Sequence, residues 1–424
     1  MLGLTRRRFG TRELTLLYQL HEFQRSILQP LSRLADATAQ VYTNPYSPFA
    51  YTPFSRRMAA TFDLVHRIGK DYRKPAFGLA STRIDGVEVP VLEENLLHKP
   101  FCNLLHFERS VPHGMAPRND PKLLIVAPMS GHHATLLRDT VRALLPNHEI
   151  YITDWIDARM VPVADGPFHL NDYIFYIQEF IRLIGSDVHV MSVCQPTVPV
   201  LAAISLMASA NEPVAPRSMI MMGGPIDTRK SPTSVNNLAT EKPLSWFETH
   251  MIYTVPHKYP GYLRRVYPGF LQHAGFVAMN PGRHATSHYD YYLQLIKGDG
   301  ESADNHREFY DEYNAVLDLS AEFYLDTIKV VFQDHALPKG EWMVADQLVR
   351  PQDITRTALL TVEGELDDIS GPGQTQAAHA LCSGIPENRR EDMVVPKTGH
   401  YGIFSGRRWR EQIAPKIADF IRRH

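Results

Sequence analysis

An alternation of apolar strands and helices runs from residue 122 to residue 222. We expect strands at 122–127, 149–153, 187–193 and 218–222, and helices at 134–145, 170–184 and 197–209. The first of these strands is a continuous apolar run, which is typical of a strand covered on both faces. Such a βαβ series predicts a mostly parallel sheet as the centre of the fold.

Other strands and helices extend this core at both ends. Asp85-Gly86 is a two-residue hairpin turn between strands at 82–84 and 87–89, and a strand at 103–107 can pair beside them. The alternation stops at Asp227. It resumes with a strand at 358–362, a helix at 374–381, a strand at 392–395 and a closing helix at 409–422. We therefore expect a core in two parts, residues 76–227 and 351–424.

The interruption, residues 228–350, is too long for a loop and must have structure of its own. Between Trp246 and Tyr292, 11 of 47 residues are aromatic, against 10% of the whole chain. We expect an aromatic-rich cap over the sheet, with Trp246 as a candidate substrate contact. The alternative is that the rings form only the cap's own core, and both can hold at once.

Residues 17–75 are expected to form an N-terminal helical segment. Apolar residues recur at three- and four-residue steps, as on one face of a helix: Leu17, Leu20, Phe23, Ile27, Leu31 and Leu34. A second helix is expected at 55–67. We expect the apolar face to pack against the main domain. Docking on an apolar surface is the alternative.

The first 16 residues form a basic leader, which we expect to be disordered. Residues 5–9, TRRRF, resemble the start of a twin-arginine export signal. The segment that follows is too short and too polar for the apolar region that such a signal needs. We therefore expect no export.

The composition excludes several classes of protein. Lys plus Arg is 44 and Asp plus Glu is 46, a net charge of −2, which argues against nucleic-acid binding. A hydrophobic fraction of 44% excludes global disorder, and no apolar stretch approaches the roughly 18 residues of a membrane span. Three cysteines (Cys102, Cys194 and Cys382) make no disulfide scaffold, suit a reducing cytoplasm and leave a thiol free for chemistry.

Cys194 is the candidate nucleophile. It follows the strand at 187–193 and precedes a helix, which is the context of a nucleophile elbow. The usual G-x-S-x-G is absent from the chain, and the segment reads Ser192-Val193-Cys194-Gln195-Pro196. A cysteine after a strand is by itself usually an inert small hydrophobe, so the assignment depends on its partners.

Those partners follow in the order nucleophile, acid, histidine, which is the order of α/β-hydrolases. Asp367 and Asp368 come just after the strand at 358–362, and His400 comes just after the strand at 392–395. Asp367 is preferred because it stands three residues after Gly364. A carboxylate there holds the imidazole in the correct tautomer, and the imidazole favours the thiolate.

An oxyanion hole completes this chemistry. One donor is expected to be the backbone N–H of Gln195, and the other comes from Met129 or Ser130, between which the sequence does not choose. Asp154 and Trp155 end another strand at the same edge of the sheet. They either line the substrate pocket or have a structural role such as capping a turn, and the structural role is favoured. The adjacent His132 and His133 lack a carboxylate four residues on, so no metal site is expected.

Five segments carry a resemblance to a known family: 17–22, 192–201, 321–325, 361–371 and 399–404. In these the chain resembles the intracellular poly(3-hydroxybutyrate) depolymerases, α/β-hydrolase-fold polyesterases with a catalytic cysteine. The likeness runs from about residue 17 to the C-terminus. It implies native, amorphous polymer in cytoplasmic storage granules as substrate, and it places Cys194, Asp367 and His400 on the family's triad. The related polyester synthases have cysteine in G-x-C-x-G, so Ser192 and Pro196 favour the depolymerase.

The expected reaction is ester cleavage through a thioester acyl-enzyme, with release of 3-hydroxybutyrate or its oligomers. No cofactor is expected, although coenzyme A could replace water as acyl acceptor. A synthase-like acyltransferase, a non-catalytic granule-surface protein and a small-ester hydrolase are the alternatives. Expected partners are the polymer or granule surface and, as an open question, a second copy of the chain.

Overall fold

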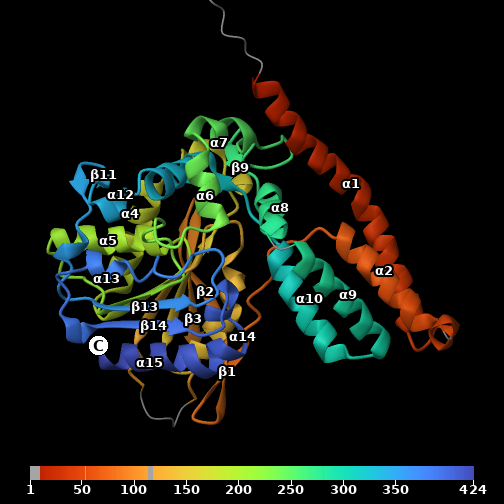
Figure 1. Ribbon diagram of the computed structural model, residues 1–424. Coiled ribbons are helices and arrows are strands. Elements are labelled where there is room, and N and C mark those ends of the chain that lie inside the picture. The colour runs from red at the N-terminus through yellow and green to blue at the C-terminus, as the bar shows by residue number, and fades with distance from the viewer. Residues whose placement is uncertain (1–9, 53, 113–117, 280) are drawn as a thin grey trace, which may run out of the picture.

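A nine-stranded sheet forms the centre of the molecule in a computed structural model that describes residues 10–52, 54–112, 118–279 and 281–424. The strands lie in the order β1-β2-β3-β5-β4-β6-β7-β13-β14 (Figure 1). Their bounds are Ser81–Ile84 (β1), Val87–Lys99 (β2), Cys102–Arg109 (β3), Lys122–Val126 (β4), Glu149–Trp155 (β5), Val188–Val193 (β6), Ser218–Met222 (β7), Ala358–Gly364 (β13) and Arg390–Val395 (β14). Pairing is parallel from β5 to β14, and β1, β2 and β3 form an antiparallel edge. The expected mostly parallel sheet is confirmed.

Helices cover both faces of this sheet. They are α3 (Arg138–Leu144), α4 (Leu170–Ile184), α5 (Thr197–Ser209), α13 (Ala378–Leu381), α14 (Gly406–Arg408) and α15 (Ala414–Arg423). The paired helices α4 and α5 lie on one face, and α15 lies on the other (Figure 1). Helix α5 is apolar all round and buries 11 of its 13 residues, as a helix inside a core must. Strands β6 and β7 are buried along their whole length. This is the α/β-hydrolase architecture.

The long insertion between β7 and β13 is folded as a cap. Its helices are α6 (Ser234–Glu241), α7 (Leu244–His250), α8 (Gly269–Met279), α9 (Pro281–Lys297), α10 (Gly300–Asn314), α11 (Ala321–Thr327) and α12 (Ala336–Lys339). Its short strands are β8 (Tyr253–Thr254), β9 (Arg265–Tyr267), β10 (Leu319–Ser320), β11 (Met343–Val344) and β12 (Gln347–Leu348). Strands β8, β9 and β10 make a small sheet of their own.

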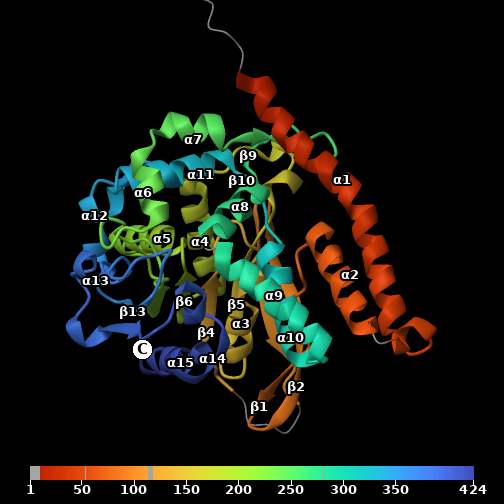
Figure 2. The ribbon, with the colours of Figure 1, turned by 45° about the vertical axis from the view of Figure 1, so that its right-hand side comes forward.

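The N-terminal segment is a hairpin of two helices, α1 (Gly10–Thr43) and α2 (Ser55–Gly69), along one edge of the molecule (Figures 1 and 2). Helix α2 packs against α9 of the cap. Because α1 begins at Gly10, the helix extends into the leader expected at 1–16. The twin-arginine-like residues 5–9 lie outside the described residues. Within the described part of the chain, no helix combines the length and the apolar character that crossing a membrane requires.

The prediction that the apolar face of α1 packs against the main domain is wrong. Leu17, Leu20, Phe23, Ile27, Leu31 and Leu34 are between 41% and 65% exposed. The helix buries its polar face instead. The Tyr18 hydroxyl donates a 2.6 Å hydrogen bond to Asp318 Oδ2, and the Glu22 carboxylate pairs with Lys258 and Arg25. Directional polar contacts therefore decide which side of α1 faces the body.

Candidate active site

Cys194 occupies a sharp turn between β6 and α5. Its φ is +69°, a left-handed conformation that non-glycine residues rarely adopt and that costs about 1–3 kcal/mol of strain. The surrounding structure holds it there, because the Cys194 N–H donates to the Met222 carbonyl at 2.7 Å. The Thr197 hydroxyl donates back to the Cys194 carbonyl at 3.0 Å. This strand–turn–helix geometry presents the side chain at the carboxyl edge of the sheet, as a nucleophile elbow does.

His400 and Asp367 meet at the same edge. His400 Nδ1 lies 2.8 Å from Asp367 Oδ2, and both side chains are buried. Asp367 Oδ1 accepts hydrogen bonds from the Ile369 and Ser370 backbone N–H groups, at 2.9 and 2.8 Å, which fixes the carboxylate. Asp368, the other candidate acid, is exposed. The structure therefore brings Asp367 rather than Asp368 to the imidazole.

The pKa of His400 is raised well above its ordinary value. Burial alone would lower this pKa, but the charges of Cys194 and Asp367, and hydrogen bonding to both, outweigh burial. A histidine between a sulfur and a carboxylate is thus stabilised as imidazolium. Since Nδ1 faces Asp367, the other ring nitrogen is left for the sulfur.

Two glycines after β7 allow the three segments to come together. Gly223 has φ +54°, and a Cβ there would lie 2.6 Å from Ile403 Cδ1 and 3.3 Å from both Asp367 Oδ2 and His400 Cε1. A Cβ at Gly224 would lie 1.7 Å from Thr197 Oγ1. Neither position has room for a side chain, so the backbone of this loop forms the wall behind the histidine and the elbow.

A cavity of about 640 Å³ opens over Cys194 and His400. Its floor comes from the sheet edge, and its roof comes from cap helices α6, α8 and α11. Most side chains of the roof are apolar, including Leu238, Phe276, Met279, Phe323 and Tyr324. The site can therefore hold an apolar acyl chain against the sulfur while excluding water from it.

The three residues expected to supply the oxyanion hole also line this cavity. They are Gln195, on the elbow, and Met129 and Ser130, on the loop after β4. The Gln195 side chain has a further property, because both its amide oxygen and its amide nitrogen are buried without a hydrogen-bond partner. An unpartnered amide that lines the same cavity as Cys194 is available to a polar group of a bound molecule.

Asp154, Trp155 and Trp246 are not among the residues that line the cavity. For Asp154 and Trp155 the sequence favours a structural role over a place in the substrate pocket, and Trp246 was the candidate substrate contact. Asp154 is buried and paired with Lys74 at 2.5 and 2.6 Å. Trp155 donates its indole N–H to the Ala127 carbonyl at 2.9 Å and stacks on Tyr173, so it supports the strands. Trp246 packs edge-on against Phe247, which lines the cavity, and stacks on His250.

The high aromatic content of residues 246–292 predicted the cap, but these residues supply only part of the cavity's roof. Of the 11 aromatic residues from Trp246 to Tyr292, Phe247, Tyr267 and Phe276 line the cavity. Phe323, Tyr324 and Phe332 also line it, but they come from a later segment that the density did not single out. The available signal was the 321–325 segment, which the family resemblance had included.

His132 and His133 are buried side chains. Burial lowers the pKa of His132 to about 4 and that of His133 to about 3, so both are neutral near pH 7. His132 Nε2 lies 3.2 Å from the Tyr313 carbonyl. Among the residues that the structure describes, no cluster of three or more His, Cys, Asp or Glu could hold a metal ion.

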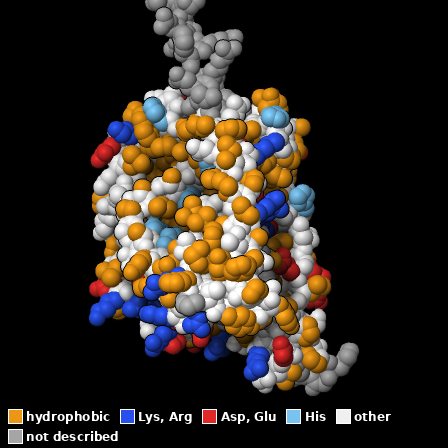
Figure 3. All heavy atoms as spheres, turned by 90° about the vertical axis from the view of Figure 1, so that its right-hand side faces the viewer, with side chains coloured by type: hydrophobic (Ala, Val, Ile, Leu, Met, Phe, Trp, Pro, Cys, Tyr) orange, Lys and Arg blue, Asp and Glu red, His pale blue; other side chains and the backbone are white. Residues whose placement is uncertain are grey.

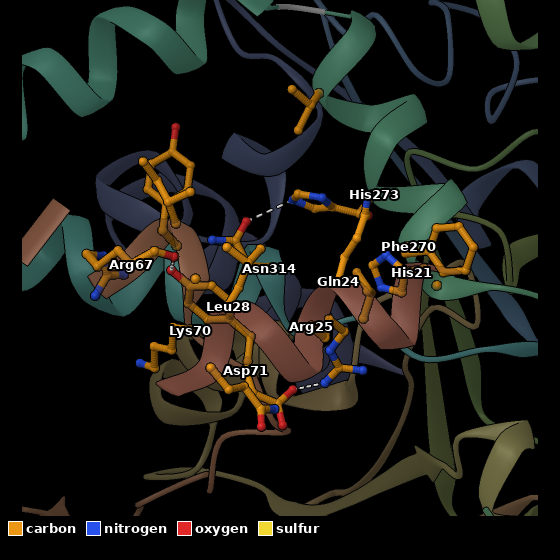
Figure 4. A pocket seen from close by; sticks show the side chains of 18 of the residues that line it. His21, Gln24, Arg25, Leu28, Arg67, Lys70, Asp71, Phe270, His273 and Asn314 are labelled. Atoms are coloured by element: carbon orange, nitrogen blue, oxygen red, sulfur yellow. Dashed lines mark hydrogen bonds and ion pairs between the residues drawn. The ribbon is translucent and has the colours of Figure 1, made fainter. Parts of the chain in front are cut away.

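A second, larger cavity of about 940 Å³ lies on the other side of α8 (Figure 4). His21 and Leu28 of α1, Arg67 of α2, and Phe270 and His273 of α8 line it. None of the three triad candidates does. Helix α8 thus separates the two cavities, and the smaller one is the candidate active site because it contains the reactive groups.

Comparison with known protein families found a match for the C-terminal part of the chain. Residues 223–424 match the family model described as the PHB de-polymerase C-terminus. These residues resemble the C-terminal domain of PHB depolymerases. The matched region begins at Gly223 and contains Asp367 and His400. Cys194 lies before it in the sequence. The chain is accordingly an ester hydrolase.

Solved α/β structures resemble the chain more distantly, and no curated protein sequence matches it. The monoacylglycerol lipase of Paleococcus ferrophilus is 11% identical over 71% of this chain and 95% of that chain (TM-score 0.41). A 2-hydroxy-6-oxo-6-phenylhexa-2,4-dienoate hydrolase from Rhodococcus sp. strain RHA1 is 14% identical over 79% and 99% (TM-score 0.43). A thermophilic esterase from Thermogutta terrifontis is 11% identical over 81% and 97% (TM-score 0.40).

Proposed function

We propose that this chain cleaves the ester bonds of poly(3-hydroxybutyrate) with Cys194 as nucleophile, His400 as acid and base, and Asp367 as the carboxylate that orients the histidine. The observation that carries this proposal is that His400, held by the buried Asp367, lines one apolar cavity together with Cys194. The PHB depolymerase match over 223–424 supports the choice of substrate.

In the first half of the reaction, the Cys194 thiolate attacks an ester carbonyl of the polymer. The carbonyl oxygen becomes an oxyanion, which the Gln195 N–H and a donor from Met129 or Ser130 stabilise. The C–O ester bond then breaks, and His400 gives its proton to the departing alkoxide. The products are a shortened polymer with a free hydroxyl and an acyl thioester on Cys194.

In the second half, an acceptor regenerates the thiolate. His400 takes a proton from water, the resulting hydroxide attacks the thioester, and a 3-hydroxybutyrate unit or short oligomer leaves as acid. Coenzyme A can serve as acceptor by the same steps, and its thiol would then carry the acyl group away. No resident cofactor takes part in either route.

The apolar roof of the cavity suits this substrate. A polyester of hydroxybutyrate carries methyl groups and ester carbonyls, and it has hydrogen-bond acceptors but almost no donors. Apolar cap side chains contact the methyl groups, and the unpartnered Gln195 amide nitrogen can donate to a carbonyl. We place the enzyme in the cytoplasm at the surface of polymer granules, where such a substrate would be found.

The test measures product release from amorphous polymer granules by wild type, Cys194→Ala and Cys382→Ala, with and without coenzyme A. Cys382 is a buried thiol outside the cavity and serves as the matched control. We expect acid or oligomers from wild type and the control, and a loss of at least ~10⁴-fold in Cys194→Ala.

Other outcomes of this experiment separate the alternatives. Product formed only with coenzyme A, as a thioester, identifies a thiolytic acyltransferase. Release from Cys194→Ala at the wild-type rate refutes the nucleophile. No release from wild type, together with incorporation of labelled hydroxybutyryl-coenzyme A into polymer, assigns a synthase instead. Turnover of soluble esters without turnover of polymer assigns a small-ester hydrolase.

A further inference from the structure

Helix α1 turns its aliphatic face toward solvent. Its exposed side carries Leu17, Leu20, Ile27, Leu31, Leu34 and Val41, whereas its buried side includes Tyr18, Glu22, Ser32 and Ala39. Transfer of a leucine or isoleucine side chain out of water is worth about 1.5–3 kcal/mol, so a row of them left in solvent is unfavourable for an isolated chain. Figure 3, which presents the side of the molecule along which α1 runs, shows hydrophobic side chains gathered over much of it.

The exposed row follows a seven-residue repeat. Leu20, Ile27, Leu34 and Val41 are spaced by seven, and between them stand Leu17, Gln24, Leu31 and Thr38, also spaced by seven. We call these eight positions the α1 stripe. They correspond to positions d and a of a coiled-coil heptad, where apolar residues pack into a facing helix. A sustained seven-residue repeat drifts by about 20° per heptad on a straight helix, so two such stripes pair by winding into a left-handed supercoil.

The chemistry of the stripe is uniform. It contains no charged residue, and its two polar members, Gln24 and Thr38, are both able to hydrogen-bond to a copy of themselves or of each other. Pro30, the proline within α1, lies at a flanking position of the repeat and not in the stripe. A surface of neutral, mainly aliphatic side chains at coiled-coil spacing is complementary to another such surface rather than to a charged partner.

The size of the stripe also suits a helix pair. With its aliphatic members and the adjacent Phe23 between 41% and 65% exposed, the stripe presents on the order of 600 Å² of apolar surface, against roughly 800 Å² per partner in a standard interface. The polar residues beside the stripe form the rim of the interface and supply the rest of the buried area. The interface is distinct from the catalytic cavity, because no residue of α1 lines that cavity.

We propose that the α1 stripe binds the α1 stripe of a second copy of this chain, forming a two-fold symmetric dimer. A two-fold axis pairs the same surface on both chains, so one self-complementary stripe is sufficient for a closed dimer. This proposal does not depend on the reaction at Cys194, and either can fail without the other.

The experiment compares molar mass in solution for three proteins, by light scattering after gel filtration and by sedimentation equilibrium. They are wild type, the stripe variant Ile27→Glu/Leu34→Glu, and the control Arg33→Glu/Gln40→Glu. The control places two carboxylates on exposed positions of the same helix outside the stripe. We expect wild type and control at twice the 48.2 kDa chain mass, and the stripe variant at the chain mass with a dissociation constant at least a hundredfold higher.

Circular dichroism and turnover of a soluble ester establish that the stripe variant is folded. If the double glutamate variant unfolds, Leu20→Gln/Leu34→Gln replaces it, and the same loss of dimer is expected. Monomeric wild type at every concentration overturns the proposal, as does a stripe variant that remains dimeric. A monomeric wild type whose binding to polymer granules is lost in the stripe variant, but not in the control, overturns it in favour of a polymer-binding face.

Discussion

Helices α5 and α1 differ in what holds them to the molecule. Helix α5 is buried almost completely among apolar strands, and its first turn fixes the Cys194 backbone through Thr197. Helix α1 packs along α2 and is tied to the body at a few points, such as Tyr18 with Asp318 and Phe270, and it leaves its aliphatic row in solvent. Apolar burial thus positions the reactive residue, whereas polar contacts position the peripheral helix.

This difference means that the same kind of side chain has different consequences in the two regions. Near the sheet edge, an added or removed group disturbs neighbours that cannot move, because interiors are close-packed. On the outer side of α1, the same change meets solvent in the isolated chain. Pairs of matched substitutions, one buried and one exposed, therefore test the comparison directly.

The largest effect is expected for the two adjacent carboxylates after β13. Asp367→Asn should lower kcat for ester hydrolysis by about 10³–10⁴-fold, because the buried carboxylate orients the His400 ring and stabilises its protonated form. Asp368→Asn should change kcat by less than about threefold, because this side chain is exposed. Steady-state kinetics on a soluble hydroxybutyrate ester measures both. Equal losses in the two variants would contradict the placement of the acid.

Two isoleucines on helices provide the second comparison. Ile174→Ala in α4 removes a fully buried side chain and should lower the free energy of unfolding by about 2–5 kcal/mol. Ile27→Ala in α1 should change it by less than about 0.5 kcal/mol in the monomer. Urea unfolding at nanomolar protein concentration measures both values. A large cost at Ile27 under these conditions would show that α1 is buried against its own chain.

Two glycines provide a smaller effect. Gly224→Ala should lower the free energy of unfolding by about 1–3 kcal/mol and reduce ester turnover, because its Cβ would overlap Thr197 and displace the elbow. Gly282→Ala in α9 meets no atom within 4 Å, and it should stabilise the protein by up to about 1 kcal/mol. Thermal unfolding together with turnover separates the two. If Gly224→Ala leaves both the free energy of unfolding and the ester turnover unchanged, the loop can shift to make room for the added Cβ.

The smallest effect concerns the pH dependence of stability. The pKa of His400 is raised in the folded protein, so its contribution is fully present below the unfolded histidine pKa and is lost as pH rises through the folded one. Asp367→Asn removes one of the causes of this rise. The free energy of unfolding should therefore fall less steeply with rising pH in Asp367→Asn than in wild type or Asp368→Asn. Urea titrations from pH 6 to 9 test this, and identical slopes would refute it.

Much of the sheet and its helices could be predicted from local sequence. The expected helices at 170–184 and 197–209 and the strand at 218–222 have the bounds of α4, α5 and β7. Helix α5 and strand β7 are buried almost completely and read as continuous hydrophobic runs, whereas α4 buries one face and shows helical periodicity. The helix expected at 374–381 is shorter, because the Glu363 carboxylate accepts hydrogen bonds from the Gly373, Thr375 and Gln376 backbone N–H groups and holds the first part as a turn.

The remaining errors concern contacts between distant segments. Periodicity identified the apolar face of α1 but not the direction it would face, which depends on Asp318 and Lys258, some 300 and 236 residues away. The partners of Asp154 and Trp155 also come from distant segments, because Lys74 pairs with the Asp154 carboxylate and the Ala127 carbonyl accepts from the Trp155 indole. Local patterns assign a residue to an element and a face, but its neighbours come from the rest of the chain.

The cap is tied to the loop that carries Met129 and Ser130. The Leu317 N–H donates to the Gly131 carbonyl at 2.8 Å, and His132 forms a β-bridge with Val316. An added Cβ at Gly131 would lie 2.7 Å from the Gln272 side chain of α8, so the two parts also touch there. This part of the cap therefore cannot move as a rigid body without displacing the loop that carries Met129 and Ser130. If these residues supply the proposed oxyanion donor, movement of the cap to admit substrate and the alignment of that donor are mechanically coupled.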